Sequence, residues 1–184
     1  LAQTLRQLAR KGGPTFYQGP LAQQILRGIN ALQASEPNFR GWTPADLSNY
    51  AVVRRAPLCN QQLQHRICTM PPPSSGGLAL LQTLALLNQS TDLPSSSAGE
   101  PQVWRQLARA QAWADADRLY WVHDPRDGAV PTEALLDQAY IARRARAMQS
   151  ANGLRPTPGL PLGIENYPYD MPDTGIENGP SHIT

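Results

Sequence analysis

The sequence predicts an α+β fold that is mostly helical, with a short two-stranded element and a long irregular C-terminal arm. Apolar residues recur at helical spacing in several segments of the first 150 residues. Residues 62–70 alternate between two sets of side chains, which is typical of a half-buried strand. From Gly153 onward, proline and glycine are frequent and no spacing is sustained. We therefore expect residues 1–152 to form the helical α+β part and residues 153–184 to form the arm.

Two helices are predicted at the start of the chain. Leu1, Leu5 and Leu8 recur on one helical face, and Gly12 suits the end of that helix. Pro20 suits the first turn of a second helix. The predicted apolar face of this second helix consists of Leu21, Ile25, Ile29 and Leu32.

A third helix and two strands are predicted next. Thr43 is a good N-cap, Pro44 suits the first helical position, and Asp46 stands where a capping box needs its acceptor. The segment YAVVRR, residues 50–55, predicts a short strand, and QLQHRICTM, residues 62–70, predicts a second one.

The two cysteines of the chain, Cys59 and Cys68, are nine residues apart. If the turn is centred near Leu63 and Gln64, the two thiols face each other across a hairpin, and a disulfide is geometrically possible. Two free thiols are an equally open alternative. A disulfide would indicate an oxidising compartment.

The octapeptide MPPPSSGG, residues 70–77, precedes a helix over residues 78–89. Three prolines favour an extended entry, and Ser74 or Ser75 can cap the helix. The helix is apolar nearly all round, so we expect it to be buried. The Ser-Ser-Gly-Gly part is a weak candidate for a phosphate cradle, because glycines let backbone amides approach an anion.

Two further helices complete the predicted fold. One runs from about Gln102 to Tyr120, and the other fills most of residues 130–149, starting at Pro131 or Thr132. The inner face predicted for the first of them consists of Val103, Leu107, Ala110 and Ala114.

Charge points to no particular macromolecular partner. The formal net charge is +2, which gives no argument for nucleic acid, and no run approaches the ~20 apolar residues that a membrane span needs. Arg143, Arg144 and Arg146 form a basic cluster. We interpret it as a solvated helix face, with phosphate contact as the alternative.

Residue chemistry alone does not reveal an activity. His65, His123 and His182 are far apart and show no metal-ligand spacing. Asp115 and Asp117 are two residues apart on a helix and do not face each other. We expect Asp117 and the adjacent arginine to make buried or half-buried structural hydrogen bonds.

A specific resemblance begins at MPPPSSGG, which is similar to a signature in the large chain of γ-glutamyltransferases. Other segments resemble the same family in the family's order, over nearly the whole chain. These segments are LAQTLRQLARKGGPTFYQGPLAQQI, WTPADLSNYAVVRRAPL, ADADRLYWVHDP and VPTEALLDQAYIARRA. We expect MPPPSSGG to direct the buried helix rather than to contact substrate.

The resemblance implies an N-terminal-nucleophile hydrolase with a four-layer αββα core. Such a protein is made as a precursor and cuts itself just before a threonine, whose hydroxyl becomes the nucleophile and whose free amine serves as the base. The implied substrates are γ-glutamyl amides such as glutathione, with water or an amino acid as acceptor. No metal or organic cofactor is implied. Family members are commonly periplasmic or extracellular.

The family's processing motif reads roughly Thr-x-His-hydrophobic-Ser/Thr, and the last five residues resemble it. Ser181, His182 and Ile183 fit the middle of the motif, but Pro180 stands in the place of the nucleophilic threonine. Proline has neither a hydroxyl nor a primary amine. In a rival register, Thr184 is itself the nucleophile.

The resemblance covers the C-terminal half of the large chain up to this motif. The implied partners are the small chain and the N-terminal half of the large chain, where the family's substrate-binding residues lie. We therefore expect residues 1–184 alone to be inactive and to self-associate through apolar surface. Two alternatives remain open: a non-catalytic family relative with a binding role, and a β-lactam acylase of the same superfamily.

Overall fold

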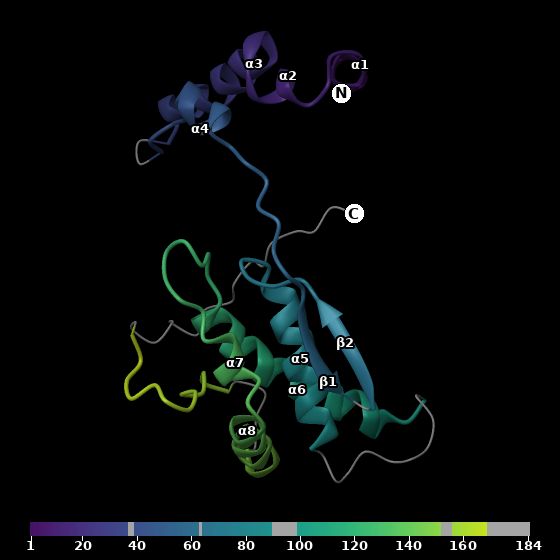
Figure 1. The fold of residues 1–184 in the computed structure, drawn as a ribbon. Helices are drawn as coiled ribbons and strands as arrows, with labels where there is room; N and C mark the ends of the chain where they lie inside the picture. The colour runs from purple at the N-terminus through teal and green to yellow at the C-terminus, as the bar shows by residue number, and fades with distance from the viewer. Residues whose placement is uncertain (37–38, 63, 90–98, 152–155, 169–184) are drawn as a thin grey trace. The chain divides into compact units, whose positions relative to one another are not determined.

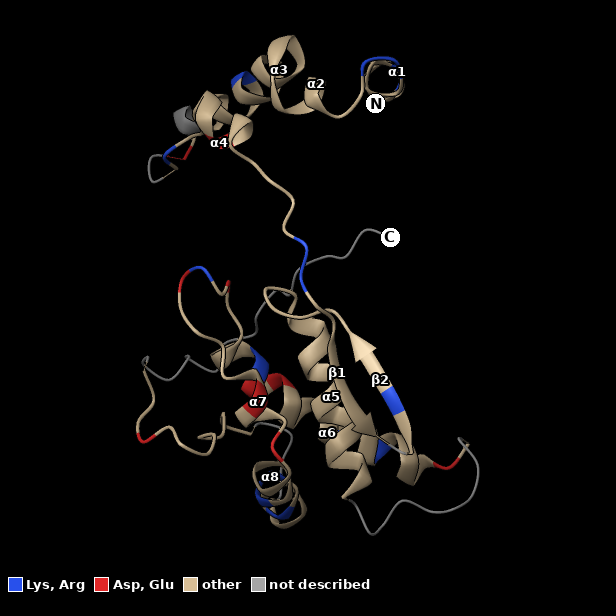
Figure 2. Cartoon of the chain, in the orientation of Figure 1, with Lys and Arg blue, Asp and Glu red and all other residues tan. Residues whose placement is uncertain are grey.

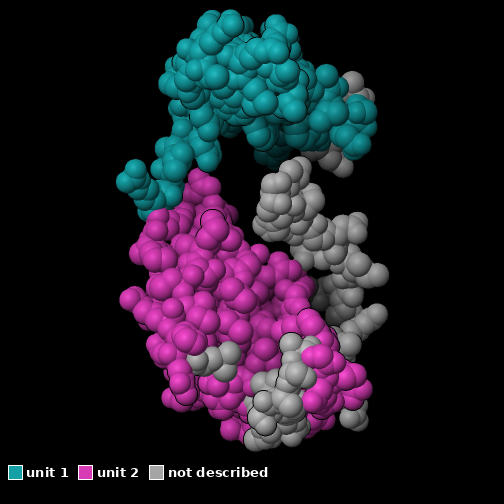
Figure 3. Space-filling model, turned by 90° about the vertical axis from the view of Figure 1, so that its right-hand side faces the viewer, with its two compact units in different colours: residues 1–54 teal, residues 55–184 magenta. Residues whose placement is uncertain are grey.

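The structure, a computed structural model, describes residues 1–36, 39–62, 64–89, 99–151 and 156–168 (Figure 1). The chain divides into two compact units, Leu1–Arg54 and Arg55–Thr184 (Figure 3). No sequence pattern predicted this division. The boundary expected between residues 152 and 153 lies in a segment outside the described residues.

The first unit is helical. Its elements are α1 (Ala2–Lys11), α2 (Pro14–Tyr17), α3 (Gly19–Asn30), the 3₁₀ turn η1 (Ala31–Ala34) and α4 (Pro44–Ser48). Its small core is formed by Ala22 and Leu26 of α3 and by Leu47 of α4. The apolar face predicted for α3 is only partly right: Leu21 is buried and Ile25 packs on this core, but Leu32 lies beyond α3 in η1 and is exposed.

Local signals in the first unit were predicted well. Helix α1 ends at Gly12, whose φ of 79° is a conformation that glycine adopts without strain. At the start of α4, the Thr43 N–H donates to the Asp46 carboxylate at 2.6 Å, and the Thr43 hydroxyl donates to the same oxygen at 2.7 Å. The predicted helix start is therefore confirmed.

The second unit begins with a hairpin. Strand β1 (Leu58–Gln62) pairs antiparallel with β2 (His65–Thr69), in a register that sets Cys59 opposite Cys68. The strand predicted at residues 50–55 is not formed. The structure shows no strand beside this segment among the described residues, and Val52 is 80% exposed. Valine favours strands because it packs well on a half-buried pleated surface, and among the described residues Val52 and Val53 remain exposed.

The helices described in the second unit are α5 (Ser75–Asn88), α6 (Pro101–Trp121), α7 (Thr132–Leu135) and α8 (Gln138–Ser150). Helix α5 packs along α6 and is buried, as its sequence predicts. The long helix predicted after residue 130 is in fact two helices. Asp137 interrupts it and caps α8, because its carboxylate accepts the N–H groups of Ala139 and Tyr140 at 2.9 and 3.0 Å.

One core joins these helices to the chain after α8. Leu78, Ala110, Leu135 and Tyr140 are fully buried in it, and Tyr167 packs against it. The inner face predicted for α6 is right for its alanines. Its more N-terminal members, Val103 and Leu107, are only half-buried, and the larger Trp113 and Trp121 lie inside instead.

The octapeptide MPPPSSGG turns the chain from β2 into α5. A Cβ atom at Gly77 would overlap the backbone oxygen of Met70 and would lie 2.8 Å from the Thr69 hydroxyl. Only glycine leaves room for this close approach between the end of β2 and the first turn of α5. The expectation that the motif directs a buried helix is confirmed.

Surface features of the described part fit the composition. Figure 2 shows Lys and Arg on several helices and on β2 rather than gathered on one element. None of the helices in the described residues is both long and apolar enough to cross a membrane. Several large apolar side chains are exposed, including Leu1, Leu5, Trp42, Val52, Val53, Met70 and Trp104. Self-association through such side chains remains a prediction.

Replacing Gly77 tests the close approach at the β2–α5 junction. We expect Gly77→Ala to lower the free energy of unfolding by about 2–3 kcal/mol, because the added methyl group must displace backbone. Gly76→Ala is the matched control: nothing lies within 4 Å of its added Cβ, and alanine favours a helix by about 0.5–1 kcal/mol. Urea denaturation should thus give effects of opposite sign, and equal effects would contradict the packing described here.

The hairpin can be tested through its cysteines, whose sulfurs are bonded in the structure. Removing a cross-link that closes a loop of nine residues lowers stability by about 2–3 kcal/mol in the chain-entropy model. We expect a reductant to lower the denaturation midpoint, and Cys59→Ser/Cys68→Ser to be equally destabilised but insensitive to reductant. A midpoint unchanged after full reduction, checked by thiol titration, would argue against a stabilising bond.

Candidate functional site

The two residues predicted to carry the chemistry, Pro180 and Thr184, lie outside the described residues. The other predicted pair, Cys59 and Cys68, forms a disulfide on the hairpin. The described segment that leads toward the predicted processing motif is residues 156–168, which we call the arm. The site with the most specific geometry is the set of side chains that hold the backbone of residues 157–160, which we call the arm clamp.

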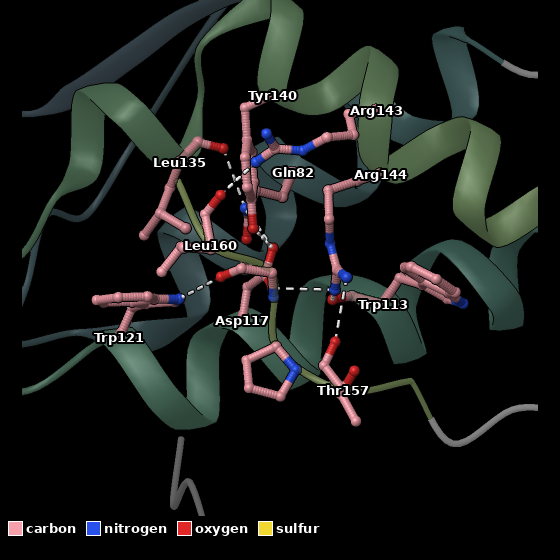
Figure 4. A network of polar contacts seen from close by, with 12 residues as sticks. Gln82, Trp113, Asp117, Trp121, Leu135, Tyr140, Arg143, Arg144, Thr157 and Leu160 are labelled. Atoms are coloured by element: carbon pink, nitrogen blue, oxygen red, sulfur yellow. Dashed lines mark hydrogen bonds and ion pairs between the residues drawn. The ribbon is translucent and has the colours of Figure 1, made fainter. Parts of the chain in front are cut away.

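Asp117 is the centre of the arm clamp (Figure 4). It is 2% exposed on the inner face of α6, which also carries Trp113 and Trp121, one turn before and after it. One carboxylate oxygen accepts from the Arg144 guanidinium at 2.9 Å and from the Gly159 N–H at 2.7 Å. These two contacts join α6 to α8 and to the arm.

The second carboxylate oxygen of Asp117 binds two neutral donors. The Tyr140 hydroxyl donates to it at 2.7 Å and the Gln82 amide at 3.1 Å. The same Gln82 nitrogen donates to the backbone oxygen of Leu135 at 3.0 Å. One carboxylate thus connects α5, α6, α8 and the arm.

Burial raises the pKa of Asp117, and the Arg144 guanidinium, the Gly159 amide, Tyr140 and Gln82 oppose that rise. All four groups donate, so a proton on either oxygen would face only donors. The geometry therefore matches the ionised carboxylate. Burial, together with the nearby carboxylate, raises the pKa of Tyr140 far above its usual value, which keeps its hydroxyl protonated as a donor.

Arg144 is the second charge of the clamp. Its guanidinium lies over the Trp113 ring at 4.4 Å and donates to the backbone oxygens of Trp113 and Thr157, both at 3.1 Å. The interpretation of the arginine cluster as a solvated face is therefore wrong for Arg144, which is 7% exposed. Its neighbours Arg143 and Arg146 are exposed, as expected.

The arm backbone is held at each residue from 157 to 160. Besides Arg144 on Thr157, the Tyr167 hydroxyl donates to the Pro158 oxygen at 2.9 Å, and the Trp121 indole donates to the Gly159 oxygen at 2.9 Å. Arg143 donates to the next backbone oxygen, that of Leu160. These contacts bind main-chain groups, so they fix a path rather than a side-chain identity.

Gly159 is the exception, because the path excludes any side chain there. A Cβ atom at this position would overlap the Tyr140 hydroxyl and lie 2.7 Å from Cδ of Arg144. Its N–H and its carbonyl both have partners in the clamp, Asp117 and Trp121. Glycine is required by close approach here.

The arm clamp can hold a peptide segment, but it offers no reactive group of its own. The Asp117 carboxylate is surrounded by donors and has no open side from which to accept a substrate proton. Within the described residues, no three His, Cys, Asp or Glu side chains are grouped in a way that could hold a metal ion. Its geometry is that of a positioning element.

The structural role expected for Asp117 and Arg118 is confirmed. Arg118 donates to Asp115 at 2.8 Å and to the Ser75 hydroxyl at 3.3 Å, which ties α6 to the start of α5. The structure does not bring the two described histidines together: His65 lies on β2 and His123 follows α6.

Sequence reasoning missed Tyr140, Arg144 and Gly159 as partners of Asp117. Two signals were available. Tyr140 and Arg144 are four residues apart, so they share one helical face. Pro158-Gly159 is a dipeptide whose glycine marks either a turn or a close approach.

Comparison with known proteins places the chain in a family. The chain is 34% identical over 140 residues to the glutathione hydrolase proenzyme of Escherichia coli, a match that covers 76% of this chain and 23% of that protein. It thus spans about a quarter of the length of this curated relative.

Solved structures agree with the sequence matches. The γ-glutamyltranspeptidase of Helicobacter pylori superposes with a TM-score of 0.71 and 28% identity, over 90% of this chain and 46% of that one. The cephalosporin acylase of Bacillus halodurans superposes with a TM-score of 0.66 and 26% identity, over 79% of this chain and 25% of that one. The helix-rich α+β unit is therefore part of an N-terminal-nucleophile hydrolase fold.

The family model described as gamma-glutamyltranspeptidase matches residues 1–183, almost the full chain, and the chain therefore belongs to the gamma-glutamyltranspeptidase family.

Proposed function

We propose that this chain is part of a self-processing enzyme that transfers the γ-glutamyl group of glutathione and other γ-glutamyl amides to water or to an amino acid. The observation that carries the proposal is the family match over residues 1–183, which runs into the predicted processing motif. The names of the relatives, glutathione hydrolase proenzymes, support both the substrate class and a precursor stage.

In this proposal the nucleophile is a threonine hydroxyl that becomes available when the precursor is cut. The hydroxyl attacks the γ-carbonyl of the substrate, the amine leaves, and the acyl-enzyme passes its glutamyl group to the acceptor. The terminal amine of the same threonine takes up the proton of the hydroxyl. No metal or organic cofactor takes part in this scheme.

Pro180 decides whether the parent protein can do this chemistry. At the nucleophile position it supplies no hydroxyl for attack on the preceding carbonyl. If Thr184 is the nucleophile instead, the proposed enzymatic function stands. Pro180 also supports a second candidate function, a non-catalytic relative that stays uncut and has a binding role.

The similarity to cephalosporin acylase supports a third candidate, an acylase of β-lactam side chains. The two enzyme classes differ at the substrate carboxylate. A γ-glutamyl site needs a cation, typically arginine, for the α-carboxylate of the substrate. In this proposal the cation lies outside residues 1–184, in the part of the parent protein that comprises the N-terminal half of the large chain and the small chain.

We propose that the parent protein works in the periplasm or outside the cell. The Cys59–Cys68 disulfide supports this placement, because such bonds persist in oxidising compartments. Residues 1–184 alone should have no turnover on a γ-glutamyl anilide, because the remaining substrate-binding groups lie elsewhere in the parent.

Intact-mass spectrometry of the parent protein, expressed whole, tests the proposal. Two chains after incubation would support the enzyme, and the new N-terminus of the small chain would identify the nucleophile. We expect Pro180→Thr to cut itself before residue 180, because the substitution restores the hydroxyl. Pro180→Ala is the control: it removes the ring without adding a hydroxyl, and it should not cut at this position.

The remaining outcomes separate the candidates. If the natural protein is cut before Thr184, and the Thr184→Ala variant is not cut, then Thr184 is the nucleophile. A natural protein of precursor mass that Pro180→Thr converts into two chains would favour the binding relative. A Pro180→Thr protein that stays whole would contradict self-processing at this motif. After the protein has been cut, its rates of hydrolysis of a γ-glutamyl anilide and of a β-lactam side-chain amide distinguish the two enzyme classes.

A further inference from the structure

The arm clamp fixes the last described segment before the predicted processing motif. Main-chain groups of Thr157, Pro158, Gly159 and Leu160 are all hydrogen-bonded to side chains of the same unit. Tyr167 then packs edge-on against Tyr120, with ring centroids 5.3 Å apart. The arm is thus held at two points, one near residue 159 and one at Tyr167.

These fixed points shorten the chain that leads to Pro180. An extended chain spans at most ~3.5 Å per residue, so Pro180 can lie no more than about 45 Å from Tyr167. If the arm were released back to Ser150, at the end of α8, that limit would rise to about 100 Å. Confining a chain end to a smaller volume raises its effective concentration at any site within reach.

We infer that Asp117 is a positioning residue for self-processing, and that it acts by anchoring the arm through the Gly159 N–H. This inference rests on the proposed function, because it assigns the clamp a role in delivering the motif to the processing site. Asp117 touches no reacting atom in this role. It holds the path of the chain from which residues 169–184 continue.

The contacts favour this role over general support of the core. Asp117 has side-chain partners on α5 and α8, but its main-chain partner in the described residues is the Gly159 N–H of the arm, at 2.7 Å, as short as the contact from the Tyr140 hydroxyl. Trp121, on the same face of α6, binds the carbonyl of the same glycine. Asp117 and Trp121, one turn apart, therefore bind both the N–H and the carbonyl of Gly159, a position where no side chain fits.

Native-state hydrogen exchange tests the anchor directly. Asp117→Asn keeps the size of the side chain but turns an NH₂ group toward neighbours that are all donors. We expect the protection of the Gly159 amide to fall about tenfold or more, as for the loss of a charged hydrogen bond. Asp115→Asn is the matched control on the same helix, because Asp115 binds Arg118 and is not a partner of the arm backbone at residues 157–160. It should change protection by less than about twofold.

The role in processing is measured on the self-cleaving form of the parent protein, which is the natural protein if it splits and Pro180→Thr if it does not. We expect Asp117→Asn to slow the first-order appearance of the small chain about threefold or more, because a freed Gly159 also breaks the bond from the Tyr167 hydroxyl to the Pro158 oxygen, so that both fixed points are released and the tether lengthens back to α8. Asp115→Asn should leave that rate unchanged. Molecules that have been cut should show the same kcat per mole of new N-terminus in all three proteins, which a general distortion of the fold would not allow.

Gly159→Ala provides an independent test that leaves Asp117 in place. The added methyl group overlaps the Tyr140 hydroxyl, so it pushes the arm out of the clamp. It should slow processing as Asp117→Asn does, and it keeps the test valid if that variant fails to fold. Gly76→Ala, whose added Cβ meets nothing, controls for a glycine replacement as such.

The outcomes distinguish this inference from the proposed function. If Asp117→Asn is cut at an unchanged rate although its Gly159 amide has lost protection from hydrogen exchange, the inference is overturned and the proposed function stands. An equal loss of kcat in the cut molecules would also overturn it, since the clamp would then serve the whole fold. Absence of cutting in every background, including Pro180→Thr, would overturn the proposed function and the inference with it.

Discussion

The ionised carboxylate of Asp117 is the interaction on which the second unit depends. It accepts four hydrogen bonds inside a core of leucine, alanine and tryptophan side chains, and the donors come from α5, α8 and the arm. A buried charge is costly unless its partners are complete, and removing any one donor leaves the carboxylate incompletely satisfied. The carboxylate is therefore fully satisfied only when the three helices and the arm are all in place.

The parts of the fold that were predictable are those governed by neighbours in sequence. The capping box at Thr43, the cysteine register of the hairpin and the buried helix after MPPPSSGG each depend on residue type within one or two turns. The break at Asp137 belongs to the same class, since an N-cap side chain inside a helical pattern is a local signal. It was missed because the apolar spacing on either side continues across it.

The remaining features depend on what a segment meets in space. Arg144 resembles a surface residue in sequence, and only the position of Asp117 on a different helix makes it a core residue. The valines at 52 and 53 have strong strand propensity, but a strand also needs a neighbouring strand or a surface to pack on. The candidate site belongs to this second class: its anchor is a contact between residues 42 positions apart.

The contact between Gly77 and Met70 bears on how relatives of this chain are recognised. The octapeptide that resembles the family so specifically has its two ends in contact, and its last glycine is required by the backbone of its first residue. The last glycine of the octapeptide is thus accounted for by chain geometry. A lineage that lost its nucleophile would remain under the same steric demand at this glycine. The presence of this glycine therefore reports on the architecture of the β2–α5 junction and does not by itself report on catalysis.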